Sequence, residues 1–369
     1  MSSAFKLAID GRALVAEPSG IGVYLNAILK GMAGNPSFKP IVMAHAAMGG
    51  LAASVEQSVH SAPSGVLWQQ AVLPKQVAKS DCDCLWSPVF TLPWRPAVPS
   101  VVTVHDMTPW LYPGTHRLKV LASIRTFFAH SMQRTSKVIT PSRHAADDLI
   151  LRYPVASGKV EVISHGVDDE FRPASVDQVN ATRSKLGLEA GYLLFSSTIE
   201  PRKNLDLLID VWQPLFVRGL APPLVVVGPV GWKSKATVER MRQLDGHGLH
   251  YLGRLPRLDQ VAVFQAATAF VLPSLYEGFG FPVLEAMACA IPVIASQRAS
   301  LPEIVADAGL LVDPSAHDQV EAAIRRLLSE PQLALELGQK GLHRSRSFSW
   351  TQSVAQHLEV FRQAISVSS

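Results

Sequence analysis

Cysteine is scarce in this sequence. Only three cysteines, Cys82, Cys84 and Cys289, occur among its 369 residues. Cys82 and Cys84 are too close in sequence to form an unstrained disulfide with each other. So few cysteines exclude a disulfide-stapled fold and favour a reducing compartment. The sequence also lacks a run of about 18 apolar residues, and its first residues lack the pattern of a secretory signal. We therefore expect a cytoplasmic protein that is soluble or peripheral on the inner face of a membrane.

Charge is neither abundant nor clustered. Charged residues make up 17% of the chain and apolar residues 48%, which is the composition of a globular protein. The net charge of +4 and the pI near 9.0 could suggest nucleic-acid binding, but the basic residues are scattered and no aromatic-basic recognition element accompanies them. We expect no nucleic-acid partner, because an anionic small ligand or an anionic membrane surface explains the charge better.

Short apolar runs alternate with longer segments of helical period along the whole chain, which is typical of parallel α/β architecture. A chain of 369 residues fits two such domains, with a cleft between them. We predict an N-terminal domain over residues 1–172, a C-terminal domain over 173–349 and a closing helix over 350–369 that could return to the first domain. The predicted strands are residues 6–10, 40–45, 101–106, 137–140, 159–164, 192–197, 224–228, 249–253, 269–274 and 292–296.

The most informative segment reads as a strand, a glycine-rich turn, a helix and another strand. Pro282 suits the first helical position, which places Glu285 in the first turn and Glu277 in the preceding loop. Gly278 and Gly280 let the backbone approach a ligand, and a helix N-terminus favours phosphate or sugar oxygens. Because a carboxylate can accept hydrogen bonds from two neighbouring hydroxyls, this segment suits a polyhydroxylated anion.

Two adjacent cations form a second candidate element. Arg202 and Lys203 follow a predicted strand and precede a helix for which Asn204 is a good N-cap. Open α/β sheets bind ligands at the carboxyl ends of their strands. The two cations could therefore neutralise a diphosphate without a metal ion, and an exposed basic turn is the alternative interpretation.

The first half of the chain offers weaker candidates. Gly20 and Gly22 precede a predicted helix, which is compatible with a phosphate cradle and equally with a plain tight turn. His105 ends a predicted strand at the ligand-binding edge, where its neighbour Asp106 could fix its tautomer. A structural histidine is the alternative.

Three other patterns have simpler interpretations. Asp81 and Asp83 resemble a metal-binding pair but lack a nearby third ligand, so we interpret them as a solvated turn and expect no metal ion. Ser300 and Glu303 have the spacing of a capping box. Residues 116–134 form a basic amphipathic pattern, which predicts a helix that either packs on its own domain or docks on anionic lipid.

Taken together, these residues resemble the family 4 retaining glycosyltransferases of the GT-B fold. The defining Glu-x7-Glu pair is present as Glu277 and Glu285, and the other matching segments follow the family's order over nearly the whole chain. They are residues 19–25, 104–113, 138–149, 163–173, 199–204, 227–232, 251–256 and 300–314. The resemblance implies two Rossmann-like domains facing across a cleft, a nucleotide-diphosphate sugar as donor, no cofactor and retention of anomeric configuration.

The resemblance also implies roles for single residues. Glu277 would contact the hydroxyls of the donor sugar, Glu285 would hold the ribose, and His105 would touch the sugar near the reacting carbon. The implied catalytic residues are His105, Glu277, Arg202 and Lys203. The implied donor-binding residues are Gly20, Gly22, Arg202, Lys203, Gly278, Phe279, Gly280, Phe281 and Glu285. The chain departs from the family pattern at four positions. Ser197, Ala290 and Ala306 stand where the family usually has glycine, and His165 stands where it usually has asparagine.

The likeness is greatest to bacterial mannosyltransferases that build lipopolysaccharide O-antigen and other surface polysaccharides. It implies transfer of mannose from GDP-mannose to a growing, lipid-linked glycan. Donors carrying UDP or dTDP remain open, as does a nucleotide-sugar epimerase or hydrolase on the same architecture. A two-lobed ligand-binding protein is the alternative that is not an enzyme.

Overall fold

The computed structural model describes residues 4–15, 20–48, 51, 55–115, 118–188 and 191–366. The chain folds into two compact units, each with a parallel sheet and flanking helices, so the predicted α/β class with two Rossmann-like domains is confirmed. Unit 1 comprises Met1–Pro113, Arg117–Gly166 and Ser349–Ser369, and unit 2 comprises Gly114–His116 and Val167–Phe348. The division at Gly166 precedes the boundary that we predicted between residues 172 and 173.

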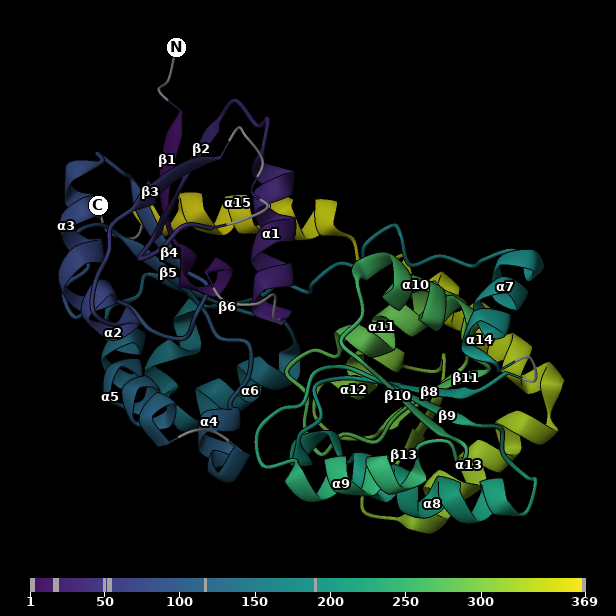
Figure 1. Cartoon of the computed structure of the whole chain (residues 1–369). Coiled ribbons are helices and arrows are strands. Elements are labelled where there is room, and N and C mark those ends of the chain that lie inside the picture. The colour runs from purple at the N-terminus through teal and green to yellow at the C-terminus, as the bar shows by residue number, and fades with distance from the viewer. Residues whose placement is uncertain are drawn as a thin grey trace. The chain divides into compact units, whose positions relative to one another are not determined.

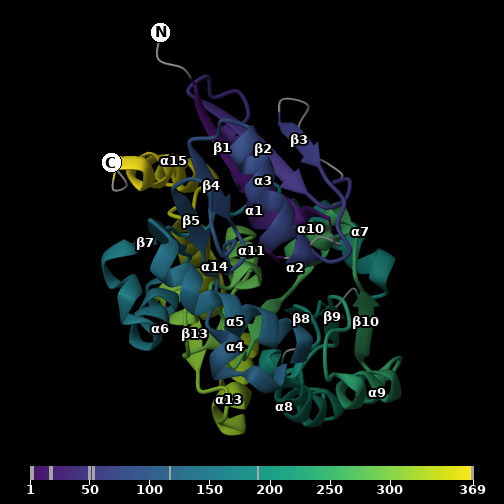
Figure 2. The ribbon, with the colours of Figure 1, turned by 90° about the vertical axis from the view of Figure 1, so that its left-hand side faces the viewer.

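Unit 1 contains a seven-stranded sheet in the order β3-β2-β1-β4-β5-β6-β7, and β1, β2 and β3 lie side by side in Figure 2. All its pairs are parallel. The order reverses between β1 and β4, which is the kind of position where open sheets bind ligands. The strands are β1 Phe5–Asp10, β2 Phe38–Ala44, β3 Glu56–Val59, β4 Cys84–Ser87, β5 Ser100–Thr103, β6 Lys137–Thr140 and β7 Val160–Val162.

The helix α15 closes unit 1. It packs on α1, β4 and β5 (Figure 1), and its Phe361 is fully buried with its ring 5.2 Å from that of Trp86. The predicted helix over 116–134 is present as α5. The helices are α1 Gly20–Met32, α2 Gly65–Leu67, α3 Leu73–Lys79, α4 Thr108–Leu111, α5 Leu118–Arg134, α6 Arg143–Arg152 and α15 Trp350–Ser366, with short turns at Gly11–Leu14, Trp68–Val72, Pro113–Thr115 and Pro154–Lys159.

Unit 2 contains a six-stranded parallel sheet in the order β10-β9-β8-β11-β12-β13, which reverses between β8 and β11. Every residue of β8, β9, β11 and β12 is buried, as expected for parallel strands covered on both faces. The strands are β8 Leu193–Ser196, β9 Leu224–Val227, β10 Leu249–Gly253, β11 Ala269–Leu272, β12 Val293–Ser296 and β13 Leu310–Val312.

Helices lie on both faces of the unit 2 sheet, with α10, α11 and α14 on one side and α8, α9 and α13 on the other (Figure 1). They are α7 Val176–Leu186, α8 Leu205–Val217, α9 Lys235–Leu244, α10 Arg257–Ala266, α11 Phe281–Ala288, α12 Leu301–Val305, α13 His317–Ser329 and α14 Pro331–Ser345, with a short turn at Pro201–Lys203. Within the described part of the chain, no helix is long and apolar enough to cross a membrane.

Candidate functional site

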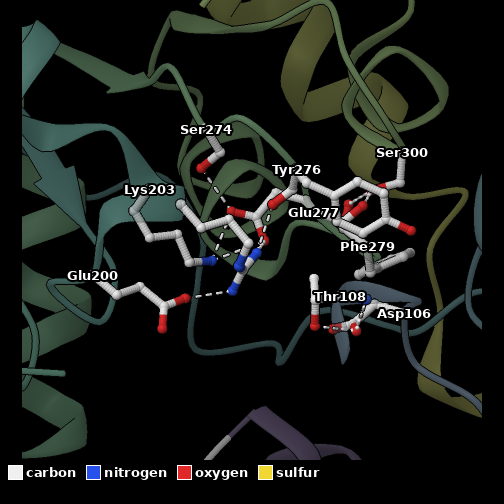
Figure 3. A network of polar contacts seen from close by, with 10 residues as sticks. Asp106, Thr108, Glu200, Lys203, Ser274, Tyr276, Glu277, Phe279 and Ser300 are labelled. Carbon is white, nitrogen blue, oxygen red and sulfur yellow. Dashed lines mark hydrogen bonds and ion pairs between the residues drawn. The ribbon is translucent and has the colours of Figure 1, made fainter. Parts of the chain in front are cut away.

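The loops that follow β8 and β11 bring three predicted site residues together. These strands are neighbours at the point where the order of the unit 2 sheet reverses, so their carboxyl ends open at one edge. Lys203 Nζ lies 2.7 and 2.8 Å from the two carboxylate oxygens of Glu277 (Figure 3). Arg202 Nη1 lies 3.3 Å from Glu277 Oε2. The exposed basic turn that we considered as the alternative is therefore wrong, since Lys203 is buried.

Three further residues complete this network. Ser274 Oγ donates to Glu277 Oε1 at 2.7 Å, and Arg202 Nη2 lies 2.6 Å from Glu200 Oε1. Arg202 Nη1 also donates to the carbonyl oxygen of Tyr276 at 2.5 Å. Glu200 and Ser274 were not predicted as site residues, although both stand within three positions of one. The result is a pair of cations fixed by two carboxylates on adjacent strand ends.

The charges of this network are stabilised mutually. Burial alone would raise the pKa of Glu277, but Lys203 and Arg202 bring that pKa below its ordinary value. Burial and the nearby Arg202 lower the pKa of Lys203, and Glu277 opposes that shift. Glu277 is therefore ionised at neutral pH, and it can accept hydrogen bonds on either oxygen.

The side chain of Ser300 contacts the backbone of the loop between Glu277 and α11. Its Oγ lies 2.9 Å from the carbonyl oxygen of Glu277 and 2.7 Å from that of Phe279, so it can donate to either of them. The capping box that we predicted is wrong, because the Ser300 side chain makes no cap hydrogen bond to α12. Gly280, the residue before α11, has a φ of 114°, and a Cβ at this position would lie 2.6 Å from Leu301. The loop conformation thus requires glycine here.

The second carboxylate, Glu285, belongs to a separate cluster. Helix α11 begins at Phe281, so Pro282 is its second residue and Glu285 is its fifth, one position later than we predicted and just beyond the first turn. Glu285 is buried, and its Oε1 accepts a hydrogen bond from Arg257 Nη1 at 3.2 Å. Burial raises the pKa of Glu285 to about 7, although Arg257 lowers it. Glu277 and Glu285 therefore bind different cations.

His105 and Asp106 lie in the loop after β5, because that strand ends at Thr103. His105 Nε2 is 2.9 Å from the carbonyl oxygen of Pro88, and a carbonyl can only accept, so Nε2 carries the proton. Our expectation that Asp106 fixes the tautomer is wrong, since Asp106 Oδ1 accepts from the backbone N–H and the hydroxyl of Thr108. Burial lowers the pKa of His105, which is therefore neutral at pH 7.

Two other sequence expectations also need correction. Gly20 and Gly22 do not form a loop ahead of a helix, because both belong to the first turn of α1. Asn204 immediately precedes α8, but its side chain does not cap that helix. Its Nδ2 lies 3.0 Å from the carbonyl oxygen of Pro273 and 2.7 Å from that of Pro314 instead. Asn204 thus ties the loop of the two cations to the loops that follow β11 and β13.

Among the residues whose structure is described, no group of three or more His, Cys, Asp or Glu side chains is arranged to hold a metal ion. Asp83, from the Asp-x-Asp pattern, accepts a hydrogen bond from the backbone N–H of Lys6 at 2.7 Å. Cys82, Cys84 and Cys289 are all buried and unbridged. The polar network around Glu277 therefore consists of ion pairs and hydrogen bonds between side chains and backbone.

Comparison with known proteins connects this geometry to a family. Residues 18–171 match the model described as Glycosyltransferase Family 4, and residues 179–344 match that described as Glycosyl transferases group 1. The O-antigen chain mannosyltransferase B of Escherichia coli is 30% identical over 279 residues, which cover 74% of this chain and 73% of that protein. The serotype-specific mannosyltransferase WbdA of Escherichia coli is 27% identical over 298 residues, covering 78% of this chain but 36% of WbdA.

Solved structures share the fold at low sequence identity. Anabaena HepE, crystallised with UDP and glucose, superposes with a TM-score of 0.76 at 19% identity, covering 96% of this chain and 99% of HepE. WaaG, a glycosyltransferase involved in lipopolysaccharide biosynthesis, superposes with a TM-score of 0.76 at 16% identity, covering 97% of this chain and 99% of WaaG. The two-unit architecture is thus the GT-B architecture.

Proposed function

The chain belongs to the glycosyltransferases of group 1 and family 4, and from this membership we propose that it transfers mannose from GDP-mannose to a growing, lipid-linked surface glycan. The names of the related E. coli enzymes support mannose and an O-antigen type of acceptor. The observation that carries the proposal is the buried cluster of Arg202, Lys203 and Glu277 at the point where the unit 2 sheet reverses its strand order.

In the proposed reaction, the bond between the sugar C1 and the diphosphate breaks as C1 bonds to the acceptor oxygen on the same face of the ring. The departing diphosphate takes the proton of the acceptor hydroxyl, so no enzymic nucleophile is required. Arg202 and Lys203 stabilise the negative charge that develops on the leaving group, which is the type of contribution that usually dominates catalysis. Glu277 accepts hydrogen bonds from hydroxyls of the donor sugar and thereby orients C1.

The tautomer of His105 defines its part in this proposal. Because Nε2–H is engaged with the carbonyl of Pro88, the second ring nitrogen, Nδ1, is an acceptor. We assign it a hydrogen bond from a hydroxyl of the donor sugar near the reacting carbon. The first turn of α1, with Gly20 and Gly22, and the amides of Gly278, Phe279, Gly280 and Phe281 complete the proposed donor contacts.

The identity of the donor is tested by thermal-shift measurements with GDP-mannose, UDP-sugars and dTDP-sugars. A ligand that binds only the folded state stabilises it by about 2.7 kcal/mol at a concentration of 100 times Kd. We expect the largest shift with GDP-mannose and an unchanged result in the presence of EDTA, since we propose no metal ion. A larger shift with UDP- or dTDP-sugars would identify a different donor.

A product assay separates the remaining functions. With radiolabelled donor and a membrane extract as acceptor, a transferase gives labelled glycan, whereas a hydrolase or epimerase consumes donor without any acceptor. Glu277→Ala should lower kcat by roughly a hundredfold or more, as does loss of one oriented group at a charged transition state. If the wild-type protein binds nucleotide sugars but Glu277→Ala changes only affinity and no turnover is found, a ligand-binding protein is indicated.

We also propose peripheral membrane contact through the start of α5. Leu121, Phe128 and Met132 of this helix are buried within unit 1, so most of its apolar face packs on its own unit. Leu118 is 81% exposed, however, and stands beside Lys119 at the start of the helix. Charge removal at Lys119 and Arg125, together with Arg117, which lies outside the described residues, should reduce flotation with anionic liposomes. Equal flotation of both proteins would end the membrane proposal.

A further inference from the structure

Arg257, the first residue of α10, is held on several sides. Its Nη1 donates to Glu285 at 3.2 Å, its Nε donates to Glu170 at 3.3 Å, and its Nη2 donates to Asp168. The guanidinium carbon lies 4.3 Å from the centroid of the Phe171 ring. Each guanidinium nitrogen therefore binds a different carboxylate, which fixes the position and the plane of the group.

The Arg257 contacts differ in burial. The side chains of Arg257 and Asp168 are 32% and 34% exposed, and that of Glu170 is 53% exposed, whereas that of Glu285 is only 10% exposed. Exposed ion pairs contribute little to stability, but a buried carboxylate depends strongly on its cation. Of the three ion pairs, the one between Arg257 and Glu285 is thus the pair whose loss would most change the charge and orientation of a carboxylate.

Two charged groups act on the carboxylate of Glu285. Arg257 reaches it from α10 and Asp168 from the segment where the chain enters unit 2, and Cys289 directly follows the last residue of α11. Burial raises the pKa of Glu285 to about 7, Arg257 opposes that rise, and Asp168 adds to it. Burial raises the pKa of the Cys289 thiol, so Cys289 stays uncharged.

We propose that Arg257 is a positioning residue for donor binding, which engages Oε1 of Glu285 and orients the carboxylate so that Oε2 accepts the ribose hydroxyls of the nucleotide sugar. This inference rests on the proposed function. A protonated Glu285 would be a poorer acceptor for two hydroxyls. An ionised Glu285 without its cation would repel the diphosphate of the same donor. The ion pair avoids both effects.

The test measures the Kd of GDP and GDP-mannose, and of the UDP equivalents, by calorimetry across about pH 5 to pH 9, for wild type and Arg257→Gln. Wild-type affinity should weaken as the pH falls through about 7, where Glu285 becomes protonated. In Arg257→Gln the weakening should begin at higher pH, and near pH 7 the affinity should be lower by roughly five- to tenfold, for a rise of one pKa unit. At saturating donor, kcat should be unchanged, and Arg257→Lys should restore part of the affinity.

Asp168→Asn is the matched control. It removes the carboxylate that raises the pKa of Glu285 and leaves the pair with Arg257 in place, so the pH midpoint should move down instead of up. Equal Kd values for wild type and Arg257→Gln at every pH would overturn the role of Arg257 and leave the proposed function standing. If no nucleotide binds even the wild type, the proposed function fails and this inference fails with it. If Arg257→Gln does not fold, Arg257→Lys and Asp168→Asn carry the test, and midpoints equal to the wild type in both would overturn it.

Discussion

Lys203 and Glu277 are buried side by side, at 7% and 6% exposure, so that each would be an uncompensated charge without the other. Breaking a buried pair by removing one partner typically costs roughly 3–5 kcal/mol of stability. We therefore expect Lys203→Met to lower the free energy of unfolding by about that amount, measured by urea denaturation.

The exposed pair of Lys39 and Glu56 supplies the control for this prediction. Its Nζ to Oε2 distance is 2.9 Å, close to that of the buried pair, but its side chains are 53% and 50% exposed. Exposed pairs contribute about 0–1 kcal/mol. Lys39→Met should therefore change the free energy of unfolding very little, and similar losses in the two variants would contradict our account of the buried pair.

Ala290 and Ala306 occupy left-handed backbone positions, with φ values of 59° and 49°. They stand where the resembling family usually has glycine, and an L-residue with this φ costs roughly 1–2 kcal/mol. Glycine relieves that strain but loses more entropy on folding, so Ala290→Gly should stabilise the protein by a few tenths to about 1 kcal/mol in urea denaturation. Ala286→Gly, within the α11 helix, should destabilise it by roughly 1 kcal/mol. A loss of stability in Ala290→Gly would show that no strain is present.

For single residues, the sequence allowed us to predict which residues belong to the site better than which contacts they make. Arg202, Lys203 and Glu277 could be found because charged residues directly after buried strands have few structural uses. Arg257 was missed, since a basic residue at the start of a helix looks solvent-exposed until its distant partners are known. Ser300 was assigned to the wrong contact because local spacing suggested a cap, whereas its actual partners lie more than 20 positions away.

Helices α1 and α15 approach most closely at Gly31. A Cβ built on Gly31 would lie 2.4 Å from Val354 Cγ2 of α15. Overpacking of this kind costs typically 1–3 kcal/mol, whereas the same substitution in an unhindered helix gains about 1 kcal/mol. Gly31→Ala should therefore destabilise the wild type but stabilise a Val354→Ala background, as measured by a double-mutant cycle. The same sign in both backgrounds would argue against close packing of the two helices.

A buried polar chain also joins these helices. The hydroxyl of Tyr24 lies 2.6 Å from His357 Nε2 and 3.1 Å from the hydroxyl of Thr103, and His357 Nδ1 lies 2.7 Å from the carbonyl oxygen of Ser353. Burial lowers the pKa of His357 from 6.5 to about 4 and brings that of His165 well below its ordinary value. Both rings are therefore neutral in the folded protein at pH 7.

The sign of the resulting pH dependence follows from linkage. Below pH 6.5 the unfolded chain binds protons on these histidines, whereas the folded chain does not. Their contribution to the free energy of unfolding is therefore complete above pH 6.5 and is lost as the pH falls towards about 4. For His357 alone the loss is roughly 3 kcal/mol. His357→Gln should show a shallower fall in the free energy of unfolding between about pH 7 and pH 4. Parallel curves for variant and wild type would exclude this role.

Most elements could be predicted from the pattern of apolar residues, and each predicted strand overlaps an observed strand. Strands β3, β4 and β13 were missed. Strands β4 and β13 are only four and three residues long, so their apolar runs are too short to indicate a strand, and β3 is largely exposed at the sheet edge and has no apolar run. Helix α11 was predicted, but its first residue was not, and one position there moves Glu285 out of the first turn.

Unit 1 is assembled from both ends of the sequence, and unit 2 from its middle. Without α15, the fully buried Trp86 and Tyr24 would lose their contacts with His357 and Phe361. A chain ending at Ser349 should therefore lose the folded structure of unit 1 and keep that of unit 2. Limited proteolysis should cut residues 4–166 rapidly and leave 167–348 resistant.

Calorimetry gives a second measure of the same truncation. We expect one remaining unfolding transition, whose Tm rises when the donor nucleotide is added, since the Arg202, Lys203 and Glu277 cluster belongs to unit 2. Phe361→Ala is the milder counterpart and should cost about 3–5 kcal/mol in unit 1. Protection of residues 4–166 in the truncated chain would contradict the role of α15.

The number of units was predictable from chain length and from the two series of strands. The point at which the chain passes between them was harder to predict, because the connecting segment contributes Asp168 and Phe171 to contacts inside unit 2. Residues 165–178 are rich in turn formers and charge, which is the composition of a linker between domains. These residues are instead fixed by Arg257, which only the tertiary structure reveals.

The place of α15 in the sheet packing has a consequence for biosynthesis. A ribosome makes the strands β1 to β7 of unit 1 before it makes Val167–Phe348 of unit 2, and the helix that covers β4 and β5 is made after both. Domains generally fold as units during synthesis, so unit 2 can complete its core while the first strands still expose Trp86. We therefore expect the first half of the nascent chain to expose apolar surface for longer than the second half, although it is translated earlier.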